Sequence, residues 1–229
     1  MTKTTNTFFE GEDFEGGVFK ALMPEYYPPE YQKYIREETA TLREKLADSK
    51  RVLEAGVGTG RLIPEIAPVV DELIGIDTAK LMLQQAASQC EKFQNAKVQE
   101  GTLEDLSKVF PANHFDNSLC VWNTLGNVSD ELLVLRELAY VTRGSIFITV
   151  FLKGTNESRK NLYKTLGVEI SHIDEENGVF FTQSGLRSKS YSAQDIQRLA
   201  EQADLEVTET KVLGGVILYA ELKKRQFES

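Results

Sequence analysis

From residue 51 onward, short apolar runs alternate with longer stretches whose apolar residues recur every three or four positions. Short apolar runs are typical of buried strands, and the longer periodic stretches are typical of amphipathic helices. The pattern predicts strands at 51–55, 72–77, 96–101, 114–122 and 144–151, with helices near 60–67, near 79–92 and from Ser129 onward. Strands that alternate with helices in this way predict a doubly wound, mostly parallel α/β sheet.

The C-terminal part of the chain predicts a helix followed by an antiparallel hairpin. Ser192-x-x-Asp195 has the spacing of a capping box and opens an amphipathic stretch. The apolar runs 205–213 and 215–222 then meet at Gly214-Gly215, which is a tight-turn signal. Together with the earlier strands, this hairpin gives a seven-stranded sheet whose last strand is antiparallel.

Two segments lie outside this scaffold. Residues 8–34 are rich in Phe, Tyr and Pro, and residues 154–191 predict a helix and then a β-hairpin that turns at Asn177-Gly178. Two interpretations stay open for both segments: a lid over a binding site, or packing against the sheet or a partner subunit. The pattern therefore divides the chain into an N-terminal lid or helical segment (1–40), an α/β domain (41–153 and 191–229) and an inserted lid (154–190).

Composition and charge narrow the class of protein. The 229 residues are 41% hydrophobic and 27% charged, which suffices for one large folded domain. No apolar run is long enough to cross a membrane, and the N-terminus lacks the apolar core of a signal peptide, so we expect a cytoplasmic protein. The net charge of −9 disfavours a nucleic-acid substrate. Two isolated histidines do not make a zinc site, so no metal is expected.

The strongest chemical signal is the loop that follows the first strand. An apolar strand ends in Glu54, the glycines Gly56, Gly58 and Gly60 alternate after it, and the next strand ends in Asp77. Glycines let the backbone turn sharply and approach a ligand closely. The third glycine comes one position too early for the dinucleotide fingerprint G-x-G-x-x-G. A carboxylate at position 54 suits an ammonium group and repels a pyrophosphate.

These residues resemble the class I S-adenosylmethionine-dependent methyltransferases. In that family the E/D-x-G-x-G-x-G loop surrounds the methionine part of the cofactor, and the acid of the next strand holds the ribose. The resemblance implies S-adenosylmethionine as cofactor and S-adenosylhomocysteine as product. It also implies that the last strand lies antiparallel beside the fifth. The alternative is a glycine-rich turn in another kind of α/β enzyme.

The resemblance assigns further cofactor contacts after the second and third strands. Thr78 lies beside the ribose acid. The family's adenine contacts follow the third strand, where this chain reads GTLEDL at 101–106. Thr102 stands where many relatives have Asp, Leu103 would pack on the adenine ring, and Glu104 would accept from the exocyclic amine.

Two residues near the N-terminus are expected to approach the methionyl end of the cofactor. In several relatives an arginine on the helix before the first strand pairs with the cofactor's carboxylate, which implies Arg36. A surface ion pair with Glu37 or Glu38 is the alternative for this arginine. Tyr26 or Tyr27 is expected to close over the same end.

The acceptor side is less specific. The segment after the fourth strand, VWNTLGN at 121–127, lacks the N/D-P-P-Y/F motif of enzymes that methylate amides or nucleobases. It is similar over a few residues to glycine N-methyltransferase-like enzymes. Asn123 is expected to contact cofactor and substrate, and Asn127 either binds substrate or caps the next helix. His172 on the inserted hairpin is the candidate base for acceptors that must lose a proton; a surface histidine is the alternative.

The sequence thus predicts methyl transfer from S-adenosylmethionine to a small-molecule acceptor by in-line displacement. The partner expected is that acceptor, not nucleic acid or membrane, in a monomer or homodimer. Three alternatives remain: a non-methylating use of the same pocket (aminopropyl transfer or cofactor binding by a regulator), an NAD-dependent oxidoreductase, and a protein methyltransferase.

Overall fold

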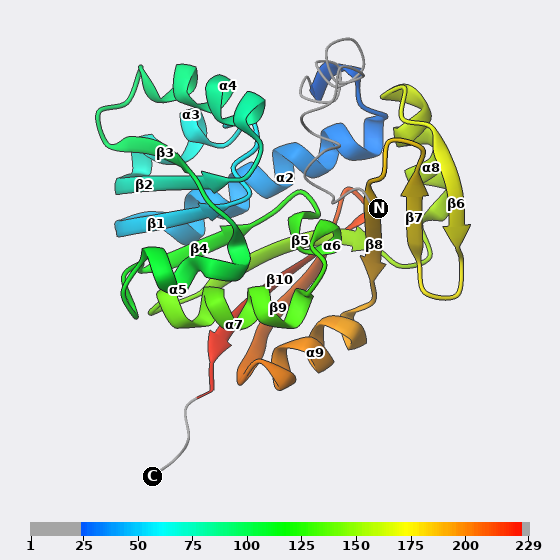
Figure 1. The fold of residues 1–229 in the computed structure, drawn as a ribbon. Coiled ribbons are helices and arrows are strands. Elements are labelled where there is room, and N and C mark those ends of the chain that lie inside the picture. Colours follow the sequence, from blue (N-terminus) through cyan, green and yellow to red (C-terminus); the bar gives the residue numbers. More distant parts are fainter. Residues whose placement is uncertain (1–23, 226–229) are drawn as a thin grey trace.

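Five parallel strands form where the apolar runs predict them. The computed structural model describes residues 24–225, and in it each run becomes one strand of a single sheet (Figure 1). The pairing order is β3-β2-β1-β4-β5. The strands are β1 (Ser49–Ala55), β2 (Val70–Asp77), β3 (Ala96–Glu100), β4 (Asn117–Cys120) and β5 (Ile146–Leu152).

The C-terminal hairpin completes the sheet beyond β5. β9 (Leu205–Leu213) and β10 (Ile217–Lys224) are antiparallel to each other, and β10 also pairs antiparallel with β5. The turn between them uses Gly214 and Gly215, both with positive φ. The predicted seven-stranded sheet, with its antiparallel last strand beside the fifth, is therefore confirmed. The helix α9 (Ala193–Gln202) begins at the predicted capping box of Ser192 and Asp195.

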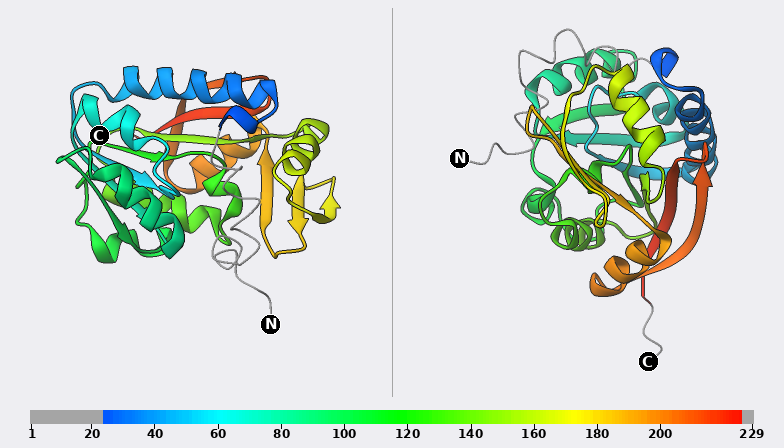
Figure 2. Two further views of the ribbon diagram at one scale, coloured as in Figure 1. Left: turned by 90° about the horizontal axis from the view of Figure 1, so that it is seen from above. Right: turned by 90° about the vertical axis from the view of Figure 1, so that its right-hand side faces the viewer.

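Alternate strand residues face two separate cores, which makes a three-layer structure. Val52 of β1 belongs to the core under α2 (Pro29–Leu46), α3 (Ile63–Ile66) and α4 (Lys80–Cys90). The next residue, Leu53, belongs to the core under α5 (Leu106–Val109), α7 (Glu131–Val141) and α9. Figure 2 shows the two helical layers on opposite faces of the sheet. The remaining short helices are η2 (Pro24–Tyr26), η3 (Ala67–Val69), η4 (Leu103–Asp105) and α6 (Thr124–Asn127).

The insertion adds strands to the main sheet. It contains α8 (Asn156–Thr165) and then β6 (Ile170–Asp174) and β7 (Val179–Thr182), an antiparallel hairpin with Gly178 in its turn at φ +67°. A third strand, β8 (Arg187–Tyr191), was not predicted because its polar sequence RSKSY lacks an apolar run. β8 pairs antiparallel with β7 and parallel with the end of β5. The described sheet therefore has ten strands, and the insertion stands beyond the carboxyl ends of β1 and β4 (Figures 1 and 2).

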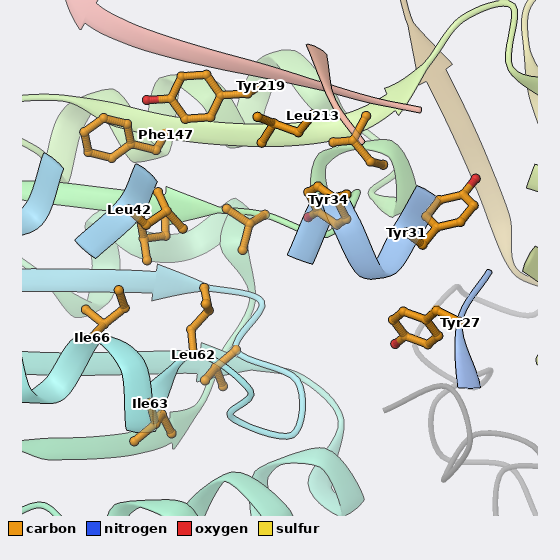
Figure 3. Packing of buried hydrophobic residues seen from close by; sticks show 14 of the residues in the cluster. Tyr27, Tyr31, Tyr34, Leu42, Leu62, Ile63, Ile66, Phe147, Leu213 and Tyr219 are labelled. Atoms are coloured by element: carbon orange, nitrogen blue, oxygen red, sulfur yellow. The ribbon is translucent and has the colours of Figure 1, made fainter. Parts of the chain in front are cut away.

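Helix α2 joins the N-terminal segment to the α/β domain. It runs continuously across the boundary expected at residue 40, so the described part of that segment packs as one body with the sheet. Its buried stripe includes Tyr31, Tyr34 and Leu42 (Figure 3). The expected lid residues 1–23 lie outside the described part of the chain. Within residues 24–225, none of the helices is long and apolar enough to cross a membrane.

Candidate functional site

A cavity of about 990 Å³ opens at the carboxyl ends of β1, β2 and β4. Ligands of doubly wound sheets bind at this edge, where the loops after the strands converge. One side of the cavity, called the cofactor half below, is lined by Glu54, residues 56–59, Arg61, Asp77, Thr78, Met82 and residues 101–104. The other side, called the acceptor half, is lined by Tyr27, residues 121–123, Phe151, Leu162, Tyr163, Leu166, Val168, Phe181 and residues 185–188.

The glycine loop follows β1 in a backbone conformation that requires glycine. Gly56, Gly58 and Gly60 have φ values of +77°, +53° and +79°. A Cβ at Gly56 would lie 2.5 Å from Thr124 Cγ2, and one at Gly60 would lie 2.7 Å from Ile63 Cδ1. A Cβ at Gly58 would meet nothing within 4 Å. Gly56 and Gly60 therefore allow the loop to pack closely against Thr124 and Ile63, whereas the space beside the Gly58 Cα is open. Gly56 and Gly58 line the cavity, and Gly60 does not.

Glu54 places an unpaired carboxylate oxygen at the cavity. The residue is 3% exposed, and its Oε2 has no hydrogen-bond partner among the described residues. Burial raises the pKa of Glu54 to about 8, although the nearby Arg61 charge opposes the rise. A buried carboxyl oxygen without a donor is costly, so a ligand that brings an ammonium group would satisfy it.

Asp77 holds the glycine loop and still faces the cavity. Its Oδ2 accepts from the Gly58 N–H at 2.9 Å, and its Oδ1 accepts from the Ala79 N–H at 3.0 Å. Burial raises the pKa of Asp77, and these backbone hydrogen bonds oppose the rise. Each carboxylate oxygen accepts more than one hydrogen bond, so Asp77 retains acceptors for the hydroxyl groups of a ribose.

The segment after β3 forms the adjoining wall. Thr102, Leu103 and Glu104 all line the cavity, as does Thr78. Leu103 is buried, and the Thr102 hydroxyl donates to the Glu104 carboxylate. These four predicted residues are thus brought to the same cavity as the glycine loop.

Arg36 and Tyr26 do not line the cavity, whereas Arg61 and Tyr27 do. Arg36 is exposed on α2, and Tyr26 is 49% exposed; neither lines the cavity. Arg61, which directly follows the glycine loop, is the cation in the cofactor half. Tyr27 is buried and lines the acceptor half, where it stacks on Trp122 with ring centroids 5.2 Å apart.

Arg61 belongs to a buried polar network that was missed in the sequence. Its guanidinium donates to Glu38 Oε2 at 2.5 Å, and the Glu38 side chain is fully buried. The hydroxyls of Tyr34 and Thr149 both donate to the other oxygen of Glu38. The signal was present, because Glu38 lies on the same helical stripe as Tyr31, Tyr34 and Leu42, and a buried carboxylate needs partners.

Asn123 lies at the cavity, but protein groups occupy its amide. Its Oδ1 accepts from the Phe151 N–H at 3.0 Å, and its Nδ2 donates to Ser188 Oγ at 3.0 Å and to Asn127 Oδ1 at 3.2 Å. Asn123 therefore ties the end of β4 to β5 and β8. Asn127 lines the cavity, and Asp130, not Asn127, caps α7.

His172 is not brought into the cavity. It is exposed on β6 and stacks on Phe181, with ring centroids 6.0 Å apart. Phe181 lines the acceptor half and separates the imidazole from it. β6 is irregular at this point: its pairing register with β7 shifts between Ile170 and His172, and Ser171 and His172 are both exposed.

Comparison with known proteins agrees with this geometry. Residues 52–144 match the family model described as a methyltransferase domain. This segment covers the glycine loop, Asp77, residues 102–104 and Asn123. The chain carries a class I S-adenosylmethionine-dependent methyltransferase domain. S-adenosylmethionine is the cofactor of that family.

Several relatives resemble the methyltransferase domain. The uncharacterized methyltransferase YcgJ of Bacillus subtilis is 35% identical over 95 residues, which are 41% of this chain and 36% of that protein. The match thus spans about a third of the relative's length. An S-adenosylmethionine-dependent methyltransferase of Aquifex aeolicus has a similar fold, with a TM-score of 0.65 and 16% identity, covering 89% of this chain and 97% of that one.

A third neighbour was solved with its ligands. It is 1,6-didemethyltoxoflavin-N1-methyltransferase of Burkholderia thailandensis with bound 1,6-didemethyltoxoflavin and S-adenosylhomocysteine. Its TM-score is 0.66 at 13% identity, covering 94% of this chain and 91% of that one. At this identity the likeness concerns the fold of the methyltransferase domain.

Proposed function

We propose that the protein transfers a methyl group from S-adenosylmethionine to a small-molecule acceptor. The observation that carries the proposal is the unpaired, buried Glu54 oxygen at one end of a cavity whose other end is aromatic. The volume of about 990 Å³ lies at the upper end of the range for small-molecule sites, so it has room for a cofactor and a second small ligand.

The cofactor half fits S-adenosylmethionine group by group. Glu54 would accept from the ammonium, Asp77 would accept from the ribose hydroxyls, and Arg61 is the cation nearest to a ligand carboxylate. Leu103 and Met82 supply apolar contact for a base. When bound, the cofactor supplies a methyl group on a positively charged sulfur that leaves readily.

The chain's own contribution is to align the reactants and exclude water. Tyr27 and Trp122 close the cavity between α2 and the end of β4, and Leu162, Leu166 and Val168 close it from the insertion. Holding two reactants in line contributes up to about 7–11 kcal/mol in favourable intramolecular models. The interpretation of residues 154–190 as a lid belongs to this proposal. Asn123 would contribute by holding the backbone at the end of β4, beside the acceptor, through its bonds with Phe151 and Ser188.

Calorimetric titration with S-adenosylhomocysteine, run in parallel with NAD, tests the proposal. We expect micromolar binding of S-adenosylhomocysteine and none of NAD. Glu54→Gln is the matched variant, because it keeps the size of the side chain and removes the charge that an ammonium would meet. Tight binding of NAD, or equal binding of S-adenosylhomocysteine by the variant, would contradict the assignment of this cavity.

A further inference from the structure

A buried arginine stands directly behind the acceptor half of the cavity. Arg159 of α8 is completely buried, which is rare for a charged side chain. Its guanidinium carbon lies 4.5 Å from the centre of the Phe151 ring and 5.5 Å from that of Tyr163, and both rings line the cavity. One layer of aromatic rings thus separates this charge from a ligand.

The guanidinium of Arg159 donates to backbone carbonyl groups and to no carboxylate among the described residues. Its Nη1 donates to the Gly178 carbonyl at 3.2 Å, and its Nη2 donates to the Ser188 carbonyl. Arg159 forms none of the ion pairs found within residues 24–225, and its Nε has no hydrogen-bond partner there. The guanidinium keeps its charge at any ordinary pH. A full positive charge is therefore held in the wall without a counterion from this part of the chain.

The described lining of the acceptor half has no carboxylate that would pair with a cationic ligand. Its charged residue, Arg187, donates to Glu131 Oε1 at 3.2 Å, and Glu131 lies outside the lining. The walls otherwise present aromatic and aliphatic side chains, including Trp122, Phe151 and Phe181. These surfaces suit a flat, apolar molecule, and the Arg159 charge behind Phe151 and Tyr163 favours a negative charge on it.

A tyrosine packed behind the cavity wall shows how the charge acts on a phenol. Tyr31 is completely buried, packs edge-on against Phe151 with centroids 6.2 Å apart, and has no hydrogen-bond partner for its hydroxyl among the described residues. Burial raises the pKa of Tyr31, with smaller contributions in the same direction from Tyr163 and Glu30, and the Arg159 charge opposes that rise. Figure 3 shows the hydroxyl of Tyr31 on the side of its ring toward β8. A phenol in the acceptor half that is less completely buried than Tyr31 would meet the same Arg159 charge with a smaller opposing effect of burial.

We propose that the acceptor half binds a flat aromatic hydroxyl compound as its phenolate, stabilised by the charge of Arg159. The inference rests on the proposed function and names its class of acceptor. The hydroxyl proton is released to solvent on binding, so no histidine is needed at the site. The phenolate oxygen then attacks the methyl carbon. The oxygen–carbon bond forms as the carbon–sulfur bond breaks, and the electron pair stays on sulfur, which leaves as a neutral thioether.

The test uses para-nitrophenol as a probe, because its phenolate absorbs visible light and its neutral form does not. The full chain, saturated with S-adenosylhomocysteine, is titrated with the probe over a range of pH. We expect the pKa of the bound probe to fall by at least about one, the lower end of the effect of a close opposite charge. In Arg159→Met the probe should bind with an unshifted or raised pKa, and Arg159→Lys should retain part of the fall.

Lys164→Gln is the matched control, since it removes one positive charge from the exposed face of the same helix. It should leave the probe's pKa as in the parent protein. Binding of the neutral phenol by the parent protein, absence of probe binding, or an equal fall in Arg159→Met and the parent would each overturn the inference. If Arg159→Met does not fold, the probe's pKa in the parent protein and in Arg159→Lys still tests the inference. Failure of S-adenosylhomocysteine to bind would count against the proposed function instead, and the probe titration without it would still test the acceptor half.

Discussion

The two halves of the cavity are built in different ways. The cofactor half comes from loops that directly follow three neighbouring parallel strands, and backbone groups position its acids, as the Gly58 and Ala79 N–H groups do for Asp77. The acceptor half comes from side chains that are far apart in the sequence, such as Tyr27, Trp122, Tyr163 and Phe181. The cofactor half carries carboxylates, whereas the described lining of the acceptor half carries none.

Under the proposed function, this difference suggests a division of tasks between the two halves. The glycine loop is fixed by the strands that it joins and by its own backbone conformation. It therefore presents the same polar groups to the cavity whichever segment lies over it. The insertion, in contrast, joins the sheet through β8 and presents mainly apolar side chains, so under the proposed function we expect it to select the acceptor. Arg61 and Glu38 connect the two halves, because they join the glycine loop to Tyr34 of α2, which stacks on Trp122 of the acceptor half.

Removing Arg61 should have the largest effect, since it breaks this connection. Arg61→Met leaves the fully buried Glu38 carboxylate with only hydroxyl donors. We expect the free energy of unfolding to fall by about 3–5 kcal/mol, the usual cost of breaking a buried ion pair. Denaturant unfolding measures it. Arg36→Met, on the exposed face of the helix that carries Glu38, should change stability by no more than about 0.5 kcal/mol. Similar losses in the two variants would show that the network does not join the halves.

Glu54→Gln should separate cofactor binding from stability. Loss of the charged acceptor should weaken S-adenosylhomocysteine binding by about 3 kcal/mol, the upper end for hydrogen bonds to charged groups.

The same substitution should increase the thermal stability of the unliganded protein at high pH. The pKa of Glu54 rises from 4.5 to about 8 on folding, so the folded state binds more protons in that interval and stability falls as pH rises through it. The variant lacks this loss and should have a higher Tm above about pH 8.

The same ionisation predicts a pH dependence of binding. Because an ammonium favours the ionised Glu54, cofactor binding should release a proton below about pH 8, and affinity should increase as pH rises toward that value. Calorimetry in two buffers of different ionisation enthalpy counts the protons. Proton release that persists in Glu54→Gln would assign it to another group.

Asp77→Ala should weaken S-adenosylhomocysteine binding by about 1–3 kcal/mol, as for a lost partner of a charged hydrogen bond. Part of this loss comes from the glycine loop, because the Gly58 N–H loses its acceptor. Asp77→Asn keeps one acceptor oxygen and should cost less. An unchanged affinity in Asp77→Ala would remove this residue from the cofactor half.

Phe181→Ala should have the smallest effect of these substitutions, and only ligand binding in the acceptor half should change. The side chain is 37% exposed, so little stability should be lost. Binding of para-nitrophenol should weaken by about 0.5–1.5 kcal/mol, as for a lost aromatic pair, while S-adenosylhomocysteine binding stays unchanged. Val212→Ala, an exposed change on β9, is the control. Equal losses for both ligands would mean that the halves are not independent.

The sequence by itself determined the sheet, its capped C-terminal helix and most of the cofactor half. These features depend on short-range patterns: apolar runs for strands, Ser192-x-x-Asp195 for a helix start, and glycines whose positive φ or close packing excludes other residues. Glu54 and Asp77 could be predicted because they stand at the carboxyl ends of apolar strands, and parallel strands bring these ends to one edge. Residues 102–104 were expected at the same edge from the resemblance to the family.

Only the tertiary structure decided the rest. Position in the chain placed Arg36, Tyr26 and His172 near the site, but the structure exposes all three. Arg36 lies on the exposed face of α2, Tyr26 ends the short helix η2, and His172 follows the register shift in β6. The same packing brings Arg61 to Glu38, Tyr27 to Trp122 and β8 to β5 across long stretches of sequence. No local pattern encodes such contacts, because they depend on how separately folded elements pack against one another.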